Sequence, residues 1–342
     1  MIIKINDLKT YFPMKKGLFK PRAYLRANDG VSFAIRRGET FGLVGESGCG
    51  KSTLGRAILG LYPPTSGQVL YAVDGVEKNL TALSTKQMRP LRSDLQMIFQ
   101  DPYSSLNPRM TVGQIIAEGV ATHGYYKKGS DAMRRYVLEI MEKCGLQSYM
   151  FHRYPHQFSG GQRQRVSIAR ALAVKPKFVV CDECVSALDV SIQAQILNLL
   201  SDLKEKEGLT YLFISHDLSV VRHIADRIAV MYLGKIMETG DAKTVFENPR
   251  HPYTMALISA SPSFLDGKGG AIAMDGEIPS PLSPPKGCPF ASRCFMAQDK
   301  CHHVPAPVVC VGEGHDVACH FAEVDTDEKR ALAYQNRATN KA

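Results

Sequence analysis

The 342-residue sequence predicts an α/β fold, and three observations support this class. Short apolar runs typical of buried strands, Thr40–Val44 and residues 178–181, lead directly into a glycine or into carboxylates. Between these runs, residues 101–172 change to a helical periodicity. Within the C-terminal hundred residues, the stretch from Cys288 to Cys319 is rich in proline and cysteine and is loop-like. We therefore expect one large α/β domain with an inserted helical subdomain and a small Cys-rich C-terminal extension.

The individual elements are expected from local patterns. Alternating apolar and polar residues indicate half-buried strands, and apolar residues three and four apart indicate helices. In chain order we expect strands at 2–8, 31–35 and Thr40–Val44, a helix at 54–61, helices at 132–144 and 164–172, a strand at 178–183, a helix at about 192–205 and a strand at Thr210–Ser215.

Composition narrows the function classes. Hydrophobic residues at 44% and charged residues at 22% are values of a globular protein. Lys and Arg number 42 against 33 Asp and Glu, and the net charge of +9 is compatible with nucleic acid, anionic lipid or a phosphate-rich ligand. No apolar run reaches 18 residues and no leader pattern is present, so we expect a cytosolic chain whose membrane role, if any, comes through a partner. Nine cysteines in a reducing compartment are not expected to form a disulfide framework.

The first functional motif is a glycine-rich turn between the strand Thr40–Val44 and a helix. Its residues are Gly45-Glu46-Ser47-Gly48-Cys49-Gly50-Lys51-Ser52. This is the context of a P-loop, in which N–H groups at a helix start face phosphate oxygens. Lys51 is expected to reach the β- and γ-phosphates, and the Ser52 hydroxyl to ligate Mg²⁺. The motif predicts nucleotide binding.

The second motif is a pair of carboxylates at the end of a buried strand. Asp182 is placed to hold hydrated Mg²⁺, and Glu183 is placed to polarise a water for attack on the γ-phosphate. His216 ends the strand Thr210–Ser215, where an imidazole would touch the γ-phosphate. A lone histidine is more often structural, so that alternative stays open.

A third motif, Ser159-Gly160-Gly161-Gln162-Arg163, opens the helix predicted at 164–172. A glycine turn at a helix start is a second phosphate-binding surface. We expect one protomer to be unable to fold it onto its own P-loop.

These motifs occur in the order found in ABC-transporter ATPase domains, which about the first 235 residues resemble. The matching residues are the P-loop, Gln100, Ser159–Gln162, the pair Asp182 and Glu183, residues 186–189, and His216. Residues 101–108, 248–254 and 276–288 are similar to ATP-binding subunits of bacterial dipeptide/oligopeptide importers, most of all to the F-type subunits of dipeptide permeases. The resemblance implies a P-loop NTPase of the ABC ATPase type, with a mixed sheet core and an antiparallel β edge.

The resemblance also implies roles for single residues. Gln100 would sense Mg²⁺ and the attacking water, and its loop would meet the membrane subunit. The residues that would bind the ATP triphosphate are Gly45, Ser47, Gly48, Cys49, Gly50, Lys51, Ser52 and Thr53. Those that would complete the site of the opposing subunit are Ser159, Gly160, Gly161 and Gln162, with Asp189 at the dimer seam.

The adenine needs an aromatic platform, because a base ring stacks on a π-face. Tyr11 is our choice, since it ends the first strand as the family's A-loop aromatic does; Phe12 and Tyr24 are the alternatives. Core packing would equally explain any one of the three.

Two residues depart from the family. Cys184 stands where the family usually has proline after the catalytic Glu, and Phe158 replaces a common leucine. Neither change removes a phosphate ligand or the base, so we expect a hydrolytically competent site whose rate depends on the rigidity of the turn at Cys184.

The C-terminal extension gathers four cysteines, Cys288, Cys294, Cys301 and Cys319, with Cys310 and several histidines nearby. Four thiolates suit Zn²⁺ or an iron–sulfur cluster. The absence of a Cys-x2-Cys pair weakens the zinc interpretation, and unmetallated thiols are a third alternative. The resemblance implies a [4Fe-4S] cluster, since similar subunits of dipeptide permeases carry one on such a quartet.

ABC-type ATPases also act on nucleic acid, so a soluble clamp is the alternative function. Repair ATPases insert a long coiled coil and translation factors join two ATPase domains, whereas this sequence has no heptads and one domain. A silent regulatory subunit is disfavoured by Glu183 and His216. The resemblance leaves other cargoes, nickel chelates or haem, open.

The predicted protein is therefore a transport ATPase that does not bind nucleic acid. It would pair with a homologous ATP-binding subunit, act on two transmembrane permease subunits, serve a separate peptide-binding protein indirectly, and lie peripherally at the cytoplasmic face of the bacterial plasma membrane. The expected domains are residues 1–235, with the helical subdomain at about 101–172, the extension at 236–322, and a polar tail at 323–342 that is a frayed helix or disordered.

Overall fold

The computed structural model describes residues 1–14, 23–73, 75–261 and 271–339, with side chains described as far as residue 333. The chain divides into two compact units. Unit 1 consists of residues 1–2, 36–40 and 82–214, and unit 2 of residues 3–35, 41–81 and 215–342. The expected domains, residues 1–235, 236–322 and 323–342, have other boundaries than these two units, and this division stays a prediction.

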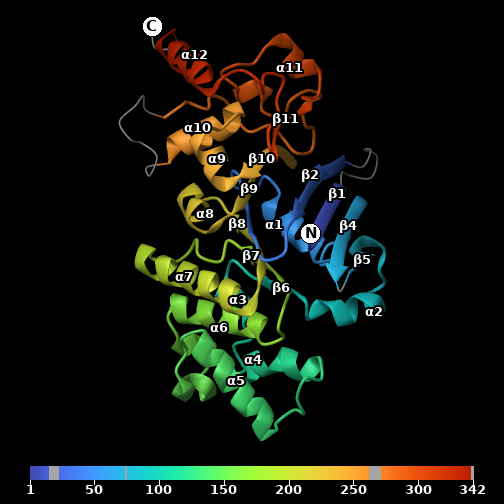
Figure 1. Cartoon of the computed structure of the whole chain (residues 1–342), viewed down its shortest axis with the longest axis vertical. Coiled ribbons are helices and arrows are strands. Elements are labelled where there is room, and N and C mark those ends of the chain that lie inside the picture. The colour runs from blue at the N-terminus through green and yellow to red at the C-terminus, as the bar shows by residue number, and fades with distance from the viewer. Residues whose placement is uncertain (15–22, 74, 262–270, 340–342) are drawn as a thin grey trace. The chain divides into compact units, whose positions relative to one another are not determined.

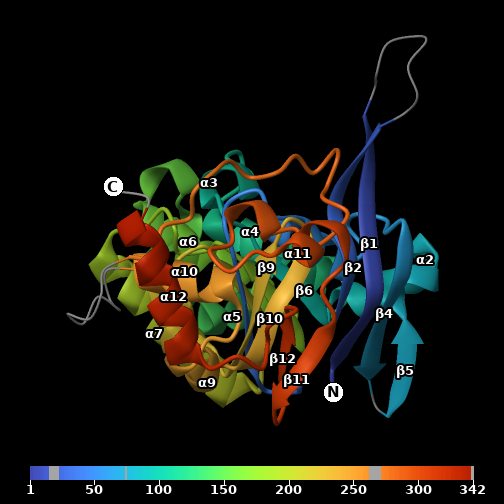
Figure 2. The same cartoon turned by 90° about the horizontal axis from the view of Figure 1, so that it is seen from above.

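Unit 2 contains an antiparallel sheet in the order β2-β1-β4-β5, visible in blue and cyan in Figure 2. Its strands are β1 (Ile3–Met14), β2 (Ala23–Ile35), β4 (Ser66–Val73) and β5 (Val76–Asn79). The first two strands are longer than predicted, because β1 and β2 pair from Ile3 opposite Ile35 to Met14 opposite Ala23. The inner face buries Ile3, Ile5 and Leu8. This sheet confirms the antiparallel β edge.

The second sheet of unit 2 has the order β11-β12-β10-β9-β3. Its strands are β3 (Thr40–Val44), β9 (Arg227–Tyr232), β10 (Lys235–Asp241), β11 (Val308–Gly312) and β12 (His315–Ala318). β3 pairs with β9 in parallel, and the other neighbours are antiparallel, so the sheet is mixed as expected. All residues of β3 are buried, which explains its uninterrupted apolar pattern.

Unit 2, as far as it is described, also contains seven helices: α1 (Lys51–Ile58), α8 (Leu218–Ile224), α9 (Ala242–Glu247), α10 (Pro252–Ala260), η6 (Ala291–Arg293), α11 (Asp299–His303) and α12 (Thr326–Thr339). A further short helix, η1 (Leu80–Ala82), spans the point in the sequence where unit 2 ends at Thr81 and unit 1 resumes at Ala82. The tail is therefore helical at α12. It is anchored by Lys329, which is fully buried and whose Nζ donates to Arg250 O at 2.6 Å.

One buried carboxylate, Glu238 on β10, holds later segments of the extension against this strand. His315 Nε2 of β12 lies 2.7 Å from Glu238 Oε1, and the N–H groups of Arg250 and His251 donate to the same carboxylate at 2.7 and 2.9 Å. Glu238 is fully buried, and three partners compensate for the loss of its hydration.

Unit 1 contains three parallel strands in the order β8-β7-β6: β6 (Leu95–Ile98), β7 (Phe178–Asp182) and β8 (Thr210–Ser215). Its helices are α2 (Thr85–Met88), η2 (Arg89–Arg92), α3 (Pro102–Ser105), α4 (Val112–Thr122), α5 (Asp131–Lys143), η3 (Ser148–His152), η4 (Pro155–Gln157), α6 (Gly160–Leu172) and α7 (Val190–Glu207).

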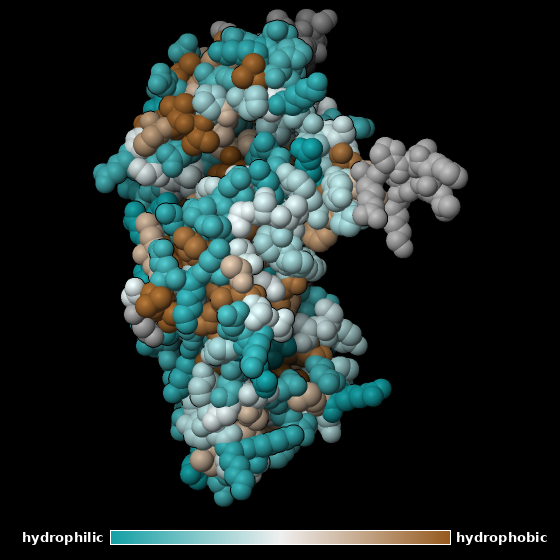
Figure 3. Space-filling view, turned by 90° about the vertical axis from the view of Figure 1, so that its right-hand side faces the viewer, coloured by the Kyte–Doolittle hydropathy of each residue, from teal (hydrophilic) through white to brown (hydrophobic). Residues whose placement is uncertain are grey.

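The predicted helical subdomain is the group of α4, α5 and α6, drawn in green in Figure 1. Its apolar faces pack against each other through Val112, Ile116, Val137 and Met141, all of which are fully buried. Among the described residues no helix is both long and apolar enough to cross a membrane. Figure 3 shows hydrophobic side chains in separate groups among hydrophilic ones.

Candidate functional site

The glycine-rich turn of unit 2 has the geometry of a phosphate-binding loop. The buried strand β3 leads into Gly45, and α1 begins at Lys51 after Gly50, whose φ is 108°. A Cβ on Gly45 would lie 2.1 Å from Met231 O, and one on Gly50 would lie 2.0 Å from Ala27 O. Only glycine fits these two positions. Since no side chain caps α1, its first N–H groups face the loop and suit an anion.

Lys51 lies inside this loop. Its side chain is buried, and Nζ donates to Gly45 O at 2.8 Å and to Glu46 O at 2.9 Å. Phosphate oxygens would replace these two carbonyls as acceptors. Cys49 packs under the loop, where burial raises the pKa of its thiol and keeps it protonated. Ser47 and Gly48 are exposed at the tip, while Ser52 and Thr53 are half-buried in the first turn of α1.

Unit 1 carries the predicted carboxylates. Asp182 ends β7 and is fully buried, and Glu183 follows it with φ 46°. Gln100 follows the parallel strand β6, and its Nε2 donates to Glu183 Oε2 at 2.9 Å. Because parallel strands end at the same edge of a sheet, residues 83 positions apart meet here. This contact places Gln100 beside the predicted base, and its expected role in sensing Mg²⁺ and the attacking water stays a prediction.

The departure at Cys184 is a buried thiol that faces a second thiol. A hydrogen bond with Cys184, followed by burial, holds the pKa of Cys181 well above its usual range. Both side chains are almost fully buried, so neither is expected to be reactive. Phe158, the other departure, is also buried, next to the start of the signature.

The signature forms the exposed start of α6. Ser159 Oγ accepts from Gln162 N at 3.3 Å, and Gln162 Oε1 accepts from Ser159 N at 3.1 Å, which is a capping box. Gly160 is exposed, and a Cβ on Gly161 would lie 2.4 Å from Ile192 Cγ2 of α7. The turn therefore needs Gly161 for close packing, and it presents an exposed helix start that the capping box satisfies only in part.

Two further candidates are exposed. Asp189 is the N-cap residue of α7 and makes no side-chain cap hydrogen bond. His216 follows β8 in sequence and belongs to unit 2. Their roles stay predictions.

Tyr11, the chosen adenine platform, is held on β1. Its hydroxyl donates to Asp29 Oδ1 at 2.5 Å, and the guanidinium of Arg26 lies 5.6 Å from the ring centroid. Burial and then the Asp29 hydrogen bond raise the pKa of Tyr11 to about 12. The alternatives differ, because Phe12 packs edge-on against Tyr62 at 5.6 Å, whereas Tyr24 is exposed. Which ring stacks on adenine stays a prediction.

Three contacts with the loop were missed by sequence reasoning. Asn28, fully buried on β2, donates from Nδ2 to Gly50 O at 3.0 Å. Tyr253 Oη accepts from Glu46 N at 2.9 Å, and Arg293 forms an ion pair with the Glu46 carboxylate at 2.8 Å. The signal that the sequence offered was Glu46, because an acidic residue inside a loop expected to bind anions calls for a basic partner elsewhere in the chain.

The four cysteines of the extension lie close enough for their charges to interact. Burial, and then the other thiols, raise the pKa of Cys288 to about 11 and of Cys294 to about 12. The N–H groups of Met296 and Phe321 donate to the sulfurs of Cys294 and Cys319 at 3.4 Å. As the described side chains stand, no three His, Cys, Asp or Glu residues are arranged to hold a metal ion.

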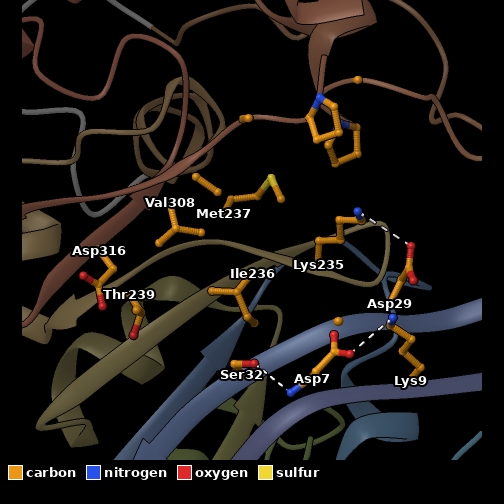
Figure 4. A pocket seen from close by; sticks show the side chains of 16 residues that line it. Asp7, Lys9, Asp29, Ser32, Lys235, Ile236, Met237, Thr239, Val308 and Asp316 are labelled. Carbon is orange, nitrogen blue, oxygen red and sulfur yellow. Dashed lines mark hydrogen bonds and ion pairs between the residues drawn. The ribbon is translucent and has the colours of Figure 1, made fainter. Parts of the chain in front are cut away.

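A cavity of about 560 Å³ lies in unit 2 beside β1, β2 and β10 (Figure 4). Ion pairs line it, Lys9 with Asp7 at 3.3 Å and Lys235 with Asp29 at 3.7 Å. None of the predicted phosphate-binding residues lines this cavity, so it is separate from the candidate nucleotide site.

The loop geometry and the end of the parallel strands define the class of protein, which is a nucleotide-binding protein with a P-loop. Comparison with known families narrows the class. The ABC transporter family model matches residues 28–186, and the model for the C-terminal region of oligopeptide/dipeptide transporters matches residues 237–301.

Two relatives span nearly the whole chain. The putative oligopeptide transport ATP-binding protein YkfD of Bacillus subtilis (strain 168) is 49% identical over 332 residues, which are 96% of this chain and 98% of that protein. The dipeptide transport ATP-binding protein DppF of Haemophilus influenzae is 49% identical over 319 residues, covering 93% and 96%.

A solved structure agrees in fold. The dimeric post-hydrolysis state of the ATP-binding cassette MJ0796, bound to ADP and Pi, matches with a TM-score of 0.61 and 27% identity, over 70% of this chain and 99% of that one. The chain belongs to the ABC transporter ATP-binding proteins of the oligopeptide/dipeptide type. The fold class, the family and the ATPase class predicted from the sequence are thereby confirmed.

Proposed function

We propose that this chain is the ATP-hydrolysing subunit of a membrane importer for dipeptides or oligopeptides. The observation that carries hydrolysis is the hydrogen bond between Gln100 and Glu183, because it holds a carboxylate base at the edge where parallel strands end. The observation that favours peptide cargo is the match of residues 237–301 to the family model for the C-terminal region of oligopeptide/dipeptide transporters.

The residues of this chain divide the work. Lys51 and the N–H groups of the loop would bind the phosphates, and Ser52, Gln100 and Asp182 would hold Mg²⁺, which neutralises the charge developing on the γ-phosphate. Glu183 would orient a water and take its proton. His216 would donate to the γ-phosphate.

The signature would serve a second subunit. Ser159 to Gln162 form an exposed helix start, which suits the γ-phosphate of an ATP molecule bound by another P-loop. The dimeric relative MJ0796 supports this arrangement. We infer a heterodimer with a homologous subunit, with Asp189 at its seam.

Transport adds membrane partners. We propose that the loop at Gln100 and the helical subdomain contact two permease subunits and transmit to them the movement that closes the ATPase dimer. We also propose that the chain lies at the cytoplasmic face of the bacterial plasma membrane. A separate peptide-binding protein would deliver the cargo. The predicted domains at 1–235 and 236–322 remain our proposal for the ATPase domain and its extension.

The test is a reconstituted complex that carries Glu183→Gln. Loss of a general base lowers a rate about 100-fold to 10,000-fold, so we expect ATP hydrolysis and peptide uptake to fall together by at least about 100-fold while ATP still binds. The matched control is Glu205→Gln, an exposed carboxylate near the C-terminal end of α7. Hydrolysis at the full rate with Glu183→Gln would contradict the proposal, and uptake of haem or a nickel chelate in place of peptides would contradict the cargo.

We further propose that Cys288, Cys294, Cys301 and Cys319 hold a [4Fe-4S] cluster. Four soft thiols, largely buried, with N–H groups donating to at least two sulfurs, suit iron–sulfur ligation, although the side chains must turn to converge. A brown preparation that loses its iron with Cys319→Ser, but not with exposed Cys310→Ser, would support the cluster. A colourless protein with one zinc per chain would replace it.

A further inference from the structure

Arg293 of the extension reaches the nucleotide loop. Its Nη1 lies 2.8 Å from Glu46 Oε2, and its Nη2 lies 3.1 Å from Glu46 Oε1, although 247 residues separate the two in sequence. Two parallel N–H···O bonds between a guanidinium and a carboxylate fix orientation as well as distance. Arg293 is the last residue of η6 and precedes Cys294, so the loop is joined directly to the cysteine segment.

Glu46 is held on three sides. Its carboxylate accepts from Arg293, its N–H donates to Tyr253 Oη at 2.9 Å, and its carbonyl accepts from Lys51 Nζ at 2.9 Å. The carbonyl that orients Lys51 therefore belongs to the residue that Arg293 grips. A shift of Glu46 would move an acceptor of the phosphate-binding lysine.

Arg293 is itself built into a buried surface. Its side chain is 8% exposed, and Nη1 also donates to Tyr232 Oη at 3.3 Å. The rings of Tyr232, Tyr253 and Phe290 pack together with centroids 4.7 to 5.4 Å apart. Phe290 lies between Cys288 and Arg293 in sequence, so the cysteine segment supplies part of the support under the loop.

A surface anchor for the extension would not need this arrangement. Exposed ion pairs contribute little and tolerate movement, whereas a paired charge that is largely buried leaves its partner uncompensated when it is removed. The extension is already anchored elsewhere, because β10 pairs with β9 from Lys235 opposite Tyr232 to Asp241 opposite Arg227. Anchoring of the extension therefore does not account for the ion pair between Arg293 and Glu46, and its effect is expected on the nucleotide loop.

We propose that Arg293 is a positioning residue for the nucleotide loop, and that through Glu46 the cysteine-bearing extension sets the affinity for ATP. This inference rests on the proposed nucleotide site, because it concerns the residue between Gly45 and Lys51. It adds a role for the extension that the ATPase reaction does not require.

The experiment measures ATP affinity of the full chain by fluorescent-nucleotide titration. Coupling between sites typically changes affinity 5-fold to 150-fold, so Arg293→Gln and Glu46→Gln are each expected to weaken ATP binding about tenfold. The double variant, in which two amides face each other, is expected to lose less than the product of the single losses. The control is Arg250→Gln, whose guanidinium donates to Val324 O and anchors the tail; its ATP affinity is expected to match that of the unchanged chain.

Two outcomes would overturn the proposal. One is an Arg293→Gln chain that has a lower melting temperature or loses metal yet binds ATP as tightly as the control. In that case Arg293 only anchors the extension and does not position the loop. The other is strict additivity of the two single variants. If the unchanged chain binds no ATP, the proposed nucleotide site fails first, and that result is distinguishable because it appears before any substitution.

A second measurement uses the unchanged chain and does not depend on how the variants fold. Coupling of binding free energies is reciprocal, so ATP must stabilise the segment that tightens the loop. Amide hydrogen exchange at Ala291–Arg293 and Cys294 is expected to slow several-fold when ATP is added, and to stay unchanged at α12. An exchange rate at Ala291–Arg293 that is the same with and without ATP would contradict the coupling.

Discussion

Gly50 shows how a single position of the loop is determined by its neighbours. Its φ of 108° is a conformation that L side chains rarely adopt, and a Cβ would lie 2.0 Å from Ala27 O. Asn28 Nδ2 also holds its carbonyl at 3.0 Å. Gly48 differs, because its φ of 78° is also left-handed but nothing lies within 4 Å of its Cβ.

We therefore predict that Gly50→Ala weakens ATP binding far more than Gly48→Ala. Backbone strain costs about 1–3 kcal/mol at either glycine, and at Gly50 the backbone clash adds to it. Titration with ATP should show at least about tenfold weaker binding for Gly50→Ala than for Gly48→Ala, which corresponds to about 1.4 kcal/mol. Equal affinities for the two variants would mean that the loop moves freely and that the clash does not matter.

At the scale of elements, the start of α10 depends on a neutral histidine. His251 is fully buried, and its Nδ1 accepts from Tyr253 N at 3.0 Å as the N-cap. Burial lowers the pKa of His251 to about 4. Protonation would place a charge in the interior and remove the acceptor that caps the helix.

The sign of the pH dependence follows from this shift. Below its ordinary pKa of about 6.5 the unfolded chain binds a proton at His251 that the folded chain refuses. This stabilisation is complete above pH 6.5 and is lost as the pH falls to about 4, in total about 3 kcal/mol. Urea unfolding between pH 7 and 4 should show a shallower loss for His251→Asn, which keeps a capping acceptor and does not titrate. A slope identical to that of the unchanged chain would contradict the assignment.

The elements also show which parts of the structure were predictable. β3 was recognisable because a strand buried on both faces is an uninterrupted apolar run. The hydrogen bond between Gln100 and Glu183 was not predicted, because it depends on the parallel pairing of β6 with β7, and β6 was not expected from the sequence. The outer halves of β1 and β2 were missed, since their pairing with each other, rather than any apolar pattern, maintains them. Arg293 was missed because its partner lies 247 residues away, and only packing of the extension brings them together.

At the scale of the whole molecule, the role proposed for the exposed signature requires a second subunit. Ser159 and Gly160 start α6 and are exposed, while the residues proposed for the loop, the base and the Mg²⁺ ligands are all present in the sequence. A helix start that faces solvent stabilises no phosphate until another P-loop brings one to it. The isolated chain is therefore expected to bind ATP and to hydrolyse it slowly.

Mixing subunits tests this expectation. Addition of the homologous ATP-binding subunit should raise hydrolysis per chain by at least about tenfold, as expected when positioned groups that stabilise a transition state are supplied. Replacing Ser159 by Arg should remove that gain without weakening ATP binding by this chain, because in the proposed arrangement Ser159 acts on the nucleotide of the partner. Lys51→Met should do the reverse and abolish binding in this chain alone. If Ser159→Arg instead weakens ATP binding by the isolated chain, the signature serves its own loop and the two-subunit arrangement is wrong.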